Sequence, residues 1–313
     1  MYVKPNTVLA ITGPTASGKT ALALEIASIN GIDAEIISAD SRQIFTCLDI
    51  GTAKPTREEM AQIPHHCIDI CEPEDSFNAG AFASKAGPII DALLSNHVLP
   101  IIVGGSGLYV QALCEGFFEE PESLRNAFAS ARKEVQSLYE QLGKDALFEH
   151  LKSIDPQSCL DYSDKNPRRI MRALEFYLAT GLQFSSEKRR MMHIPTFQTT
   201  YVMINHERDA LYQRINARCD EIWEGTKQEA KFMMERGVSR NAQSMDTVGY
   251  SQALSYLFGE ISEESAINMM KQATRNYAKR QLTWSKRIKD MHILKGNLKE
   301  MAVEALSLIR ESP

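Results

Sequence analysis

The chain has 313 residues, of which 43% are hydrophobic and 24% are charged, and its formal net charge is −5. This length can bury a sizeable core, either as one large domain or as a core domain with a smaller insertion. No stretch approaches the roughly 18 apolar residues of a membrane span, and the N-terminus lacks a basic region followed by an apolar stretch. The scattered cysteines form no CxxC pair, which is typical of reduced thiols. We therefore expect a cytoplasmic globular protein that has no membrane partner.

A glycine-bounded loop near the N-terminus is the strongest single motif. The apolar run Thr7–Thr12 is predicted to be a strand, and residues 21–27 are predicted to be helical. The loop between them has the G-x-x-x-x-G-K-T spacing of the phosphate-binding loop, in which backbone N–H groups and a helix N-terminus surround phosphates. Lys19 would reach the terminal phosphates, and the Thr20 hydroxyl would bind Mg²⁺. The expected phosphate-binding residues are Gly13, Thr15, Ala16, Ser17, Gly18, Lys19 and Thr20.

A second predicted strand, Ala34–Ser38, ends just before Asp40. In open parallel sheets functional residues gather at the carboxyl ends of strands, so Asp40 is expected at the same rim as the phosphate loop. A carboxylate there can serve as a general base, as a Mg²⁺ partner through water, or only as a helix cap. The local sequence leaves these three roles open.

The next stretch continues the alternation of strands and helices. Cys67–Ile70 is a short strand candidate, residues 79–96 form an amphipathic helical pattern with a break expected at Pro88, and Pro100–Val103 is typical of a buried parallel strand. Two glycines and Ser106 follow that strand, where a hydroxyl could meet a ligand, although a simple glycine turn is the alternative. The pattern predicts a doubly wound α/β core of the P-loop NTPase type, a parallel sheet flanked by helices.

The second half begins with a region that has few strand signals. Helical periodicity over residues 117–190 predicts a smaller all-helical insertion domain. A strand returns at Tyr201–Asn205, and a long helix is expected from about residue 209 to 236. Arg208 lies between them and would face the phosphate rim if that strand joins the parallel sheet. We therefore expect a P-loop core formed by residues 1–116 and 191–313, with a last long helix capped by Ser262.

The charges are distributed unevenly along the chain. Residues 1–160 contain 11 Lys and Arg against 21 Asp and Glu, whereas residues 161–313 contain 24 against 19. Basic clusters can bind a nucleic-acid backbone despite an acidic total, because attraction depends on local potential; solvated helix faces are the alternative. Tyr277 and Trp284 share a face of the last helix and could stack on bases or pack in the core. The clusters comprise Lys165, Arg168, Arg169 and Arg172, then Lys188, Arg189 and Arg190, and then Lys271, Arg275, Lys279, Arg280, Lys286, Arg287 and Lys289.

Seven motifs follow one another in a characteristic order: Gly13–Thr20, Ser38–Gln43, Asp49–Pro55, Gly104–Tyr109, Asn166–Glu175, Val248–Tyr250 and Thr274–Trp284. Together they resemble the bacterial tRNA dimethylallyltransferase family, whose members are also called tRNA isopentenyltransferases. A lone phosphate loop would be a weak indication, whereas this ordered set is specific and spans nearly the whole chain.

The resemblance implies transfer of a dimethylallyl group from dimethylallyl diphosphate to the exocyclic amine of the adenosine 3′-adjacent to the anticodon in tRNA, with release of diphosphate. An allylic diphosphate ionises easily when charge on the leaving pyrophosphate is stabilised, as the phosphate loop, Lys19, Mg²⁺ and an arginine would do. By position in the family pattern, Arg208 is the expected arginine. Asp40 would orient and deprotonate the attacking amine, and Ser106 would hydrogen-bond at the adenosine.

The same resemblance favours RNA binding for the basic clusters, and the enzyme must extract the target base from its stack. We expect a monomer that binds the anticodon arm through a tRNA-contacting insertion domain. The chain departs from the family pattern at Ser106, where threonine is usual, and at Ser251, where a basic residue is frequent. The expected tRNA contacts are Asp40, Ser41, Arg42, Gln43, Ser106, Arg168, Arg169, Arg172, Lys279 and Arg280.

Two other functions would also use the phosphate-binding loop Gly13–Thr20. A P-loop kinase would bind ATP there, use Asp40 as the base toward a hydroxyl, and close its basic insertion as a lid. A nucleotide-gated RNA-binding switch would carry out no transfer chemistry.

Overall fold

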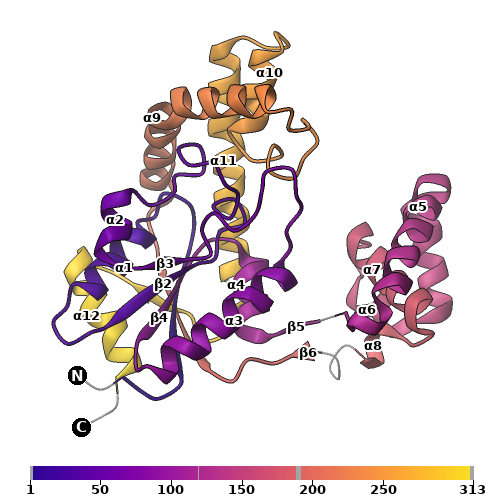
Figure 1. Ribbon diagram of the computed structural model, residues 1–313, viewed down its shortest axis with the longest axis horizontal. Coiled ribbons are helices and arrows are strands. Elements are labelled where there is room, and N and C mark those ends of the chain that lie inside the picture. The colour runs from indigo at the N-terminus through magenta and orange to yellow at the C-terminus, as the bar shows by residue number, and fades with distance from the viewer. Residues whose placement is uncertain (1–2, 119, 188–191, 311–313) are drawn as a thin grey trace. The chain divides into compact units, whose positions relative to one another are not determined.

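Figure 1 shows the computed structural model, which describes residues 3–118, 120–187 and 192–310. The chain separates into two compact units, Met1–Glu115 with Pro195–Pro313, and Gly116–Ile194. Each unit has its own apolar core. No helix among the described residues combines the length and apolar character needed to cross a bilayer.

The first unit is built on a six-stranded sheet with the order β3-β2-β4-β1-β7-β8, and all its strand pairs are parallel. The central strands are unbroken apolar runs and are buried along their whole length, as expected for a sheet covered on both faces. This confirms the predicted α/β core. The strands are β1 (Thr7–Thr12), β2 (Ala34–Ser38), β3 (His65–His66), β4 (Leu99–Val103), β7 (Gln198–Ile204) and β8 (His292–Leu294).

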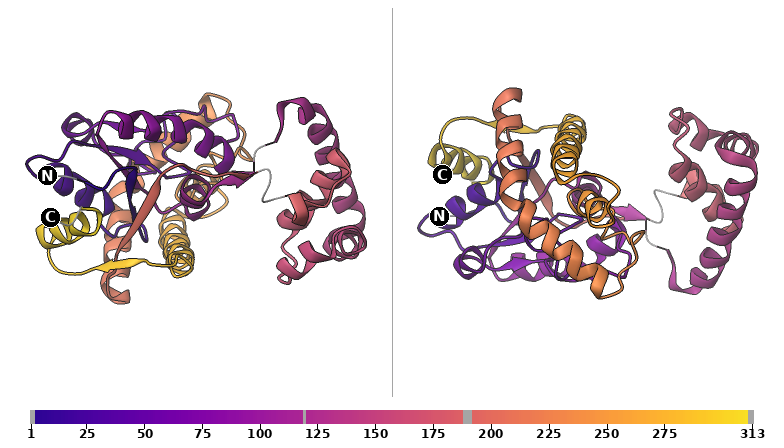
Figure 2. Two further views of the ribbon diagram at one scale, coloured as in Figure 1. Left: turned by 90° about the horizontal axis from the view of Figure 1, so that it is seen from below. Right: turned by 90° about the horizontal axis from the view of Figure 1, so that it is seen from above.

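Helices cover both faces of this sheet (Figures 1 and 2). Residues of α1 and α12 pack with one face in a single apolar cluster, and α3 and α4 lie against each other on the opposite side. Side chains of Thr56, Asn78, Ser262 and Asn297 cap the N-termini of α2, α3, α11 and α12, which confirms the cap expected at Ser262. The helices are α1 (Lys19–Ala27), α2 (Arg57–Gln62), α3 (Ala79–Ser95), α4 (Gly107–Glu115), α9 (Arg208–Glu235), α10 (Tyr250–Leu257), α11 (Glu263–Ser285) and α12 (Leu298–Ile309).

Two local predictions were wrong. The strand expected at Cys67–Ile70 is instead the short β3, because Cys67 and Asp69 adopt left-handed backbone angles, φ 63° and 54°, that a strand cannot contain. The break expected at Pro88 does not occur, since α3 continues through that residue.

The second unit is mainly helical, and the predicted insertion over residues 117–190 falls within it. Aromatic rings of Phe118, Phe128, Phe176 and Phe184 contact one another in its core. A two-stranded antiparallel pair, β5 (Phe117–Phe118) with β6 (Met192–His193), adds to the predicted helices. The remaining elements are the 3₁₀ turn Glu122–Leu124 and the helices α5 (Arg125–Ile154), α6 (Pro156–Asp161), α7 (Pro167–Thr180) and α8 (Phe184–Glu187).

Candidate active site

Three loops meet where the central parallel strands end. Ser38 and Ile11 both pair with Val103, so the carboxyl ends of β2, β1 and β4 lie at one level of the sheet. The loops that follow these strands line a cavity of about 600 Å³, together with residues of α9 and α11. The cavity therefore lies at the carboxyl ends of the strands, the rim expected from the sequence for Asp40 and the phosphate loop.

The loop after β1 presents its backbone to this cavity. Gly13, Ala16 and Gly18 have left-handed φ angles of 128°, 61° and 95°, which turn the chain tightly into α1. No side chain caps the N-terminus of α1, and its first turn contains no acidic residue. The hydroxyl of Ser17 is buried without a hydrogen-bond partner. N–H groups at a helix N-terminus next to an unpaired hydroxyl suit an anionic ligand.

Lys19 folds back over this loop. Its Nζ donates to the carbonyl oxygens of Gly13 (3.1 Å) and Pro14 (2.8 Å). Burial lowers the pKa of the Lys19 amine to about 8, the Asp40 carboxylate opposes that shift, and the Arg218 guanidinium adds to it. Thr20 lines the same cavity.

The loops after β2 and β4 are joined around Asp40 and Ser106. Asp40 Oδ1 accepts from the N–H of Arg42 at 2.9 Å. Ser106 Oγ accepts from the N–H of Ser41 at 2.9 Å and donates to Ser41 Oγ at 3.1 Å. A Cβ at Gly104 would lie 2.1 Å from the Ala39 carbonyl oxygen, so the close approach of the two loops requires glycine there.

The arginines of α9 differ from the expectation. Arg208 is exposed, its guanidinium lies 5.2 Å from the ring centroid of Tyr212, and it does not line the cavity. Arg214 and Arg218, one helical turn apart, line the cavity instead, and Arg214 Nε donates to the Ala16 carbonyl at 2.8 Å. Burial lowers the pKa of the Arg218 guanidinium, and the Asp40 carboxylate opposes that shift. The i, i+4 spacing of these two arginines was the available sequence signal.

A second cavity of about 400 Å³ adjoins the first. Asp40, Arg218 and Tyr277 line both, so they stand at the junction. Burial and the Asp40 charge raise the pKa of Tyr277 to about 12, which keeps its hydroxyl protonated at neutral pH. Arg42 and Arg280 also line the second cavity.

Gln281 ties α11 to two of the loops. Its Oε1 accepts from the N–H of Thr15 at 2.8 Å, and its Nε2 donates to the Gly105 carbonyl at 3.1 Å. A Cβ at Gly105 would lie 1.9 Å from this Nε2. Trp284 instead packs against Gly107, where a Cβ would lie 2.3 Å from the indole. On the helix face that these two aromatic residues share, Tyr277 therefore lines the cavities, whereas Trp284 packs against α4.

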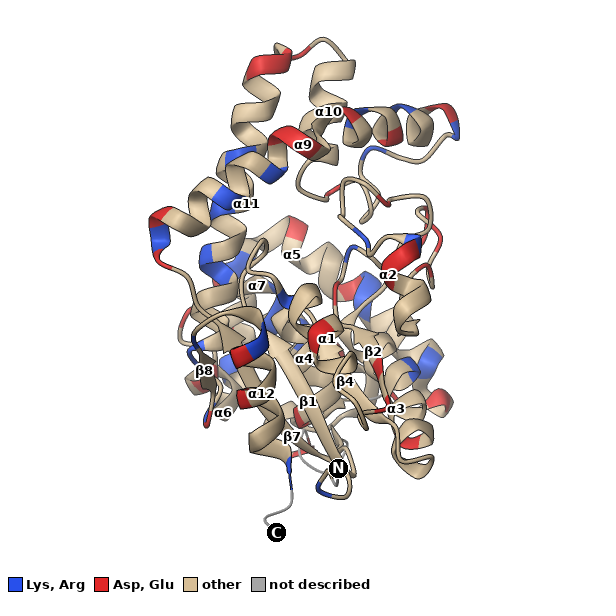
Figure 3. Ribbon diagram, turned by 90° about the vertical axis from the view of Figure 1, so that its left-hand side faces the viewer, with Lys and Arg blue, Asp and Glu red and all other residues tan. Residues whose placement is uncertain are grey.

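The predicted tRNA-binding residues are in several settings. Lys and Arg residues lie along α11 (Figure 3), with Lys279 and Arg280 exposed. In the second unit Arg168 and Arg169 are exposed, whereas Arg172 is ion-paired with Glu120 at 2.5 Å and Glu175 at 3.6 Å. The predicted cluster at residues 188–190 lies outside the described residues.

The residues that could bind a metal ion lie at the carboxyl ends of the strands. Among the described residues, no group of three or more His, Cys, Asp and Glu side chains is arranged for metal binding. Thr20 and Asp40 both line the first cavity and offer a hydroxyl and a carboxylate. Such a sparse oxygen set fits Mg²⁺, which keeps several waters and takes further oxygens from a phosphate substrate.

Comparisons with known proteins identify one family. A family model described as IPP transferase matches residues 43–288. The tRNA dimethylallyltransferase of Staphylococcus carnosus (strain TM300) is 40% identical over 289 residues, which cover 92% of this chain and 90% of the relative. A crystal structure of tRNA delta(2)-isopentenylpyrophosphate transferase from Staphylococcus epidermidis is 38% identical with a TM-score of 0.69, covering 98% of this chain and 99% of that chain. A structure of a eukaryotic dimethylallyltransferase acting on tRNA is 25% identical with a TM-score of 0.77, and the match covers 92% of this chain and 73% of that chain. The chain therefore belongs to the IPP transferase family.

Proposed function

We propose that this protein transfers a dimethylallyl group from dimethylallyl diphosphate to the exocyclic amine of the adenosine 3′-adjacent to the anticodon in tRNA, releasing diphosphate. The observation that supports this most directly is the junction of the two cavities. Asp40, Arg218 and Tyr277 line both, so a phosphate-bearing donor in one and a base in the other would meet at a carboxylate.

The donor binds with its diphosphate on the N-terminus of α1. The loop N–H groups, Lys19 and the guanidinium groups of Arg214 and Arg218 stabilise the charge that develops on the leaving diphosphate as the allylic C–O bond breaks. These groups are held in place before the reaction, so little reorganisation opposes them. The Thr20 hydroxyl would hold Mg²⁺, which would supply further charge neutralisation at the diphosphate.

Asp40 acts at the acceptor. The exocyclic amine of adenine is a poor nucleophile because its lone pair is delocalised into the ring, so a carboxylate that orients it and removes its proton accelerates attack. The hydrogen bond from the Arg42 N–H to Oδ1 orients the Asp40 carboxylate. Ser106, fixed by Ser41, and the protonated Tyr277 hydroxyl supply hydrogen bonds beside it.

The RNA partner binds through basic residues of each unit. Arg42 and Arg280 line the second cavity, where an extracted base would enter, and Lys279 extends the basic surface of α11. Arg168 and Arg169 offer phosphate contacts on the second unit. We further propose that the protein acts as a monomer in the cytoplasm, where tRNA is present.

A labelling experiment tests the function. The protein is incubated with tRNA that lacks the modification and with either radiolabelled dimethylallyl diphosphate or γ-labelled ATP. Label from the allylic donor in tRNA is the expected result. Phosphate transfer from ATP would instead indicate a kinase, and tight tRNA binding without transfer would indicate an RNA-binding switch.

A further inference from the structure

The loop formed by residues 47–54 lines both cavities and is held in place largely by Glu229, which lines neither. Gly51, Thr52 and Ala53 contribute to the second cavity, and Thr52 and Ala53 also line the first. The loop contains no helix or strand, and Cys47 and Ala53 adopt left-handed φ angles of 62° and 48°. Non-glycine residues in this conformation cost about 1 to 2 kcal/mol each, so the surroundings must hold the loop in place.

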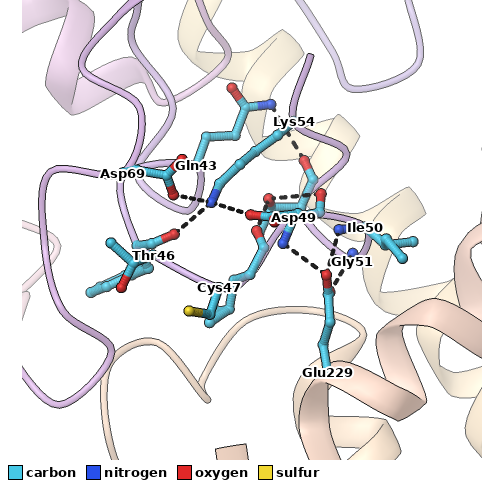
Figure 4. Close-up of polar contacts among 12 residues, drawn as sticks. Gln43, Thr46, Cys47, Asp49, Ile50, Gly51, Lys54, Asp69 and Glu229 are labelled. Carbon is cyan, nitrogen blue, oxygen red and sulfur yellow. Dashed lines mark hydrogen bonds and ion pairs between the residues drawn. The ribbon is translucent and has the colours of Figure 1, made fainter. Parts of the chain in front are cut away.

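Glu229 of α9 provides the main tether (Figure 4). Its Oε1 accepts from the N–H groups of Asp49 (2.9 Å) and Ile50 (2.8 Å), and its Oε2 accepts from the N–H of Gly51 at 3.0 Å. The hydroxyl of Tyr250 donates to Oε2 at 2.5 Å. Three consecutive N–H groups form a nest of the kind that binds anions, and here the anion is a side chain of the same protein.

Close packing accompanies these hydrogen bonds. A Cβ at Gly51 would lie 2.6 Å from the Tyr250 ring, and a Cβ at Gly225 of α9 would lie 2.5 Å from Ile50. Tyr250 is fully buried. The loop therefore packs closely against α9 and against Tyr250 of the Val248–Tyr250 motif.

The far end of the loop is fixed by Lys54. Its Nζ donates to the Phe45 carbonyl at 2.7 Å and to Asp49 at 2.6 Å, and it is also ion-paired with Asp69. The side chain of Lys54 is only 5% exposed. Glu229 and Lys54 thus hold the two ends of the same short segment.

The loop in turn holds Gln43. Gln43 Nε2 donates to the carbonyl oxygens of Ala53 at 3.0 Å and Thr52 at 3.4 Å, while its Oε1 accepts from the Ser38 hydroxyl at 2.9 Å. Gln43 lies three residues after Asp40 and lines the first cavity. A displacement of the loop would therefore move Gln43 and reshape the wall beside the carboxylate.

We propose that Glu229 is a positioning residue, which sets the catalytic geometry by holding the segment Asp49–Ala53, and with it Gln43, against the junction of the cavities. Glu229 lines neither cavity and contacts no reacting group, so it acts through the loop. The inference rests on the proposed transferase function.

The test compares Glu229→Gln with the wild-type protein in the labelled transfer assay. Gln keeps the size but places an amide NH₂ among N–H donors, so the loop shifts and kcat for transfer falls about 100-fold, the scale of a 1 Å misplacement. The Kd for inorganic pyrophosphate, measured by calorimetry, stays within roughly two-fold because the loop after β1 is not tethered by Glu229. Glu235→Gln on the same helix, whose carboxylate makes only a 3.8 Å ion pair with Lys231, is the matched control and keeps full kcat.

A double-mutant cycle separates positioning from mere stability. In a Gln43→Ala background, Glu229→Gln should lower kcat only a few-fold further, because both changes disrupt the same wall. Tyr250→Phe, which removes one of the four donors, should lower kcat about five-fold and gives a milder variant if Glu229→Gln does not fold. Unchanged kcat in Glu229→Gln or Tyr250→Phe, or penalties that simply multiply in the cycle, would overturn the inference. Failure of the wild-type protein to label tRNA would instead refute the proposed function.

Discussion

Lys19 is expected to take up a proton when a diphosphate binds at basic pH. In the protein without ligand, burial lowers the pKa of its amine from 10.5 to about 8. A shift of this size corresponds to about 3 kcal/mol favouring the neutral amine. A bound diphosphate places negative charge beside Nζ and favours the ammonium form, so the pKa returns toward its ordinary value on binding.

The affinity should therefore depend on pH in a defined window. With a pKa of about 8 in the unliganded protein and one near 10.5 in the complex, Kd rises about ten-fold per pH unit from pH 8 to 10. The ligand is already ionised there, because the second pKa of a phosphate monoester is about 6. Burial lowers the pKa of His65, which therefore titrates below this window, and raises that of Tyr277 to about 12, above the window.

Calorimetry with dimethylallyl diphosphate in the absence of tRNA measures this effect. At pH 9, titrations in two buffers of different ionisation enthalpy should reveal uptake of about 0.9 proton per diphosphate bound. Lys19→Met should bind more weakly and show no such uptake. A wild-type Kd that is the same at pH 7.5 and pH 9.5, with no proton uptake, would refute the reasoning.

The same shift predicts a change in stability. Because the pKa of Lys19 is lower in the folded than in the unfolded chain, the folded protein holds fewer protons between pH 8 and 10.5, and unfolding takes protons up. The resulting penalty is fully present below pH 8 and disappears as the pH rises to 10.5. Lys19→Met should thus raise the free energy of unfolding at pH 7 by up to about 3 kcal/mol, with no gain at pH 10.5, as denaturant titrations would show.

Five further substitutions test the proposed roles. Asp40→Asn keeps an oxygen that can accept from the Arg42 N–H but removes the base, so transfer should fall by about 10² to 10⁴ while tRNA affinity is retained; near-normal turnover would exclude Asp40 as the base. Arg218→Ala should lower kcat by about 10² to 10³ and Arg208→Ala far less, because only Arg218 lines the cavities. Equal losses would indicate that Arg208 also acts on the diphosphate. Arg168→Ala should reduce the salt slope of tRNA binding by about one, whereas Arg172→Ala should instead lower the free energy of unfolding by about 1 to 3 kcal/mol, and a reduced slope for Arg172→Ala would show that it reaches RNA.

The parts of the candidate site that directly follow strands could be predicted from the local sequence. The loop before Lys19, the position of Asp40 after β2 and that of Ser106 after β4 were all predictable, because carboxyl ends of parallel strands meet at one rim. The central strands were recognisable since Leu99–Val103 and Thr7–Thr12 are unbroken apolar runs. In contrast, β8 has only three residues, two of them exposed, and presents no periodicity to detect.

The parts that were missed come from helices distant in sequence. Arg208 is the arginine expected from its position in the family pattern, but Arg218, which lines the cavities, lies ten residues further along α9, about 15 Å at the rise of an α-helix. The amphipathic pattern of α9 defines its buried face without revealing which loop that face meets. Arg172 shows a partial signal in Glu175 at i+3, but its partner Glu120 is 52 residues away and could not be assigned from spacing.

The helix α11 connects the loop after β1 with the exposed basic residues Lys279 and Arg280. Tyr277 and Gln281, four residues apart, share the face turned to the cavities, while Lys279 and Arg280 are exposed. Gln281 bridges Thr15 and the Gly105 carbonyl, so the position of α11 fixes the gap between the loops after β1 and β4. Because Lys279 and Gln281 belong to one helix, a ligand that engaged Lys279 could not displace α11 without also moving the hydrogen bond that the Thr15 N–H donates to Gln281.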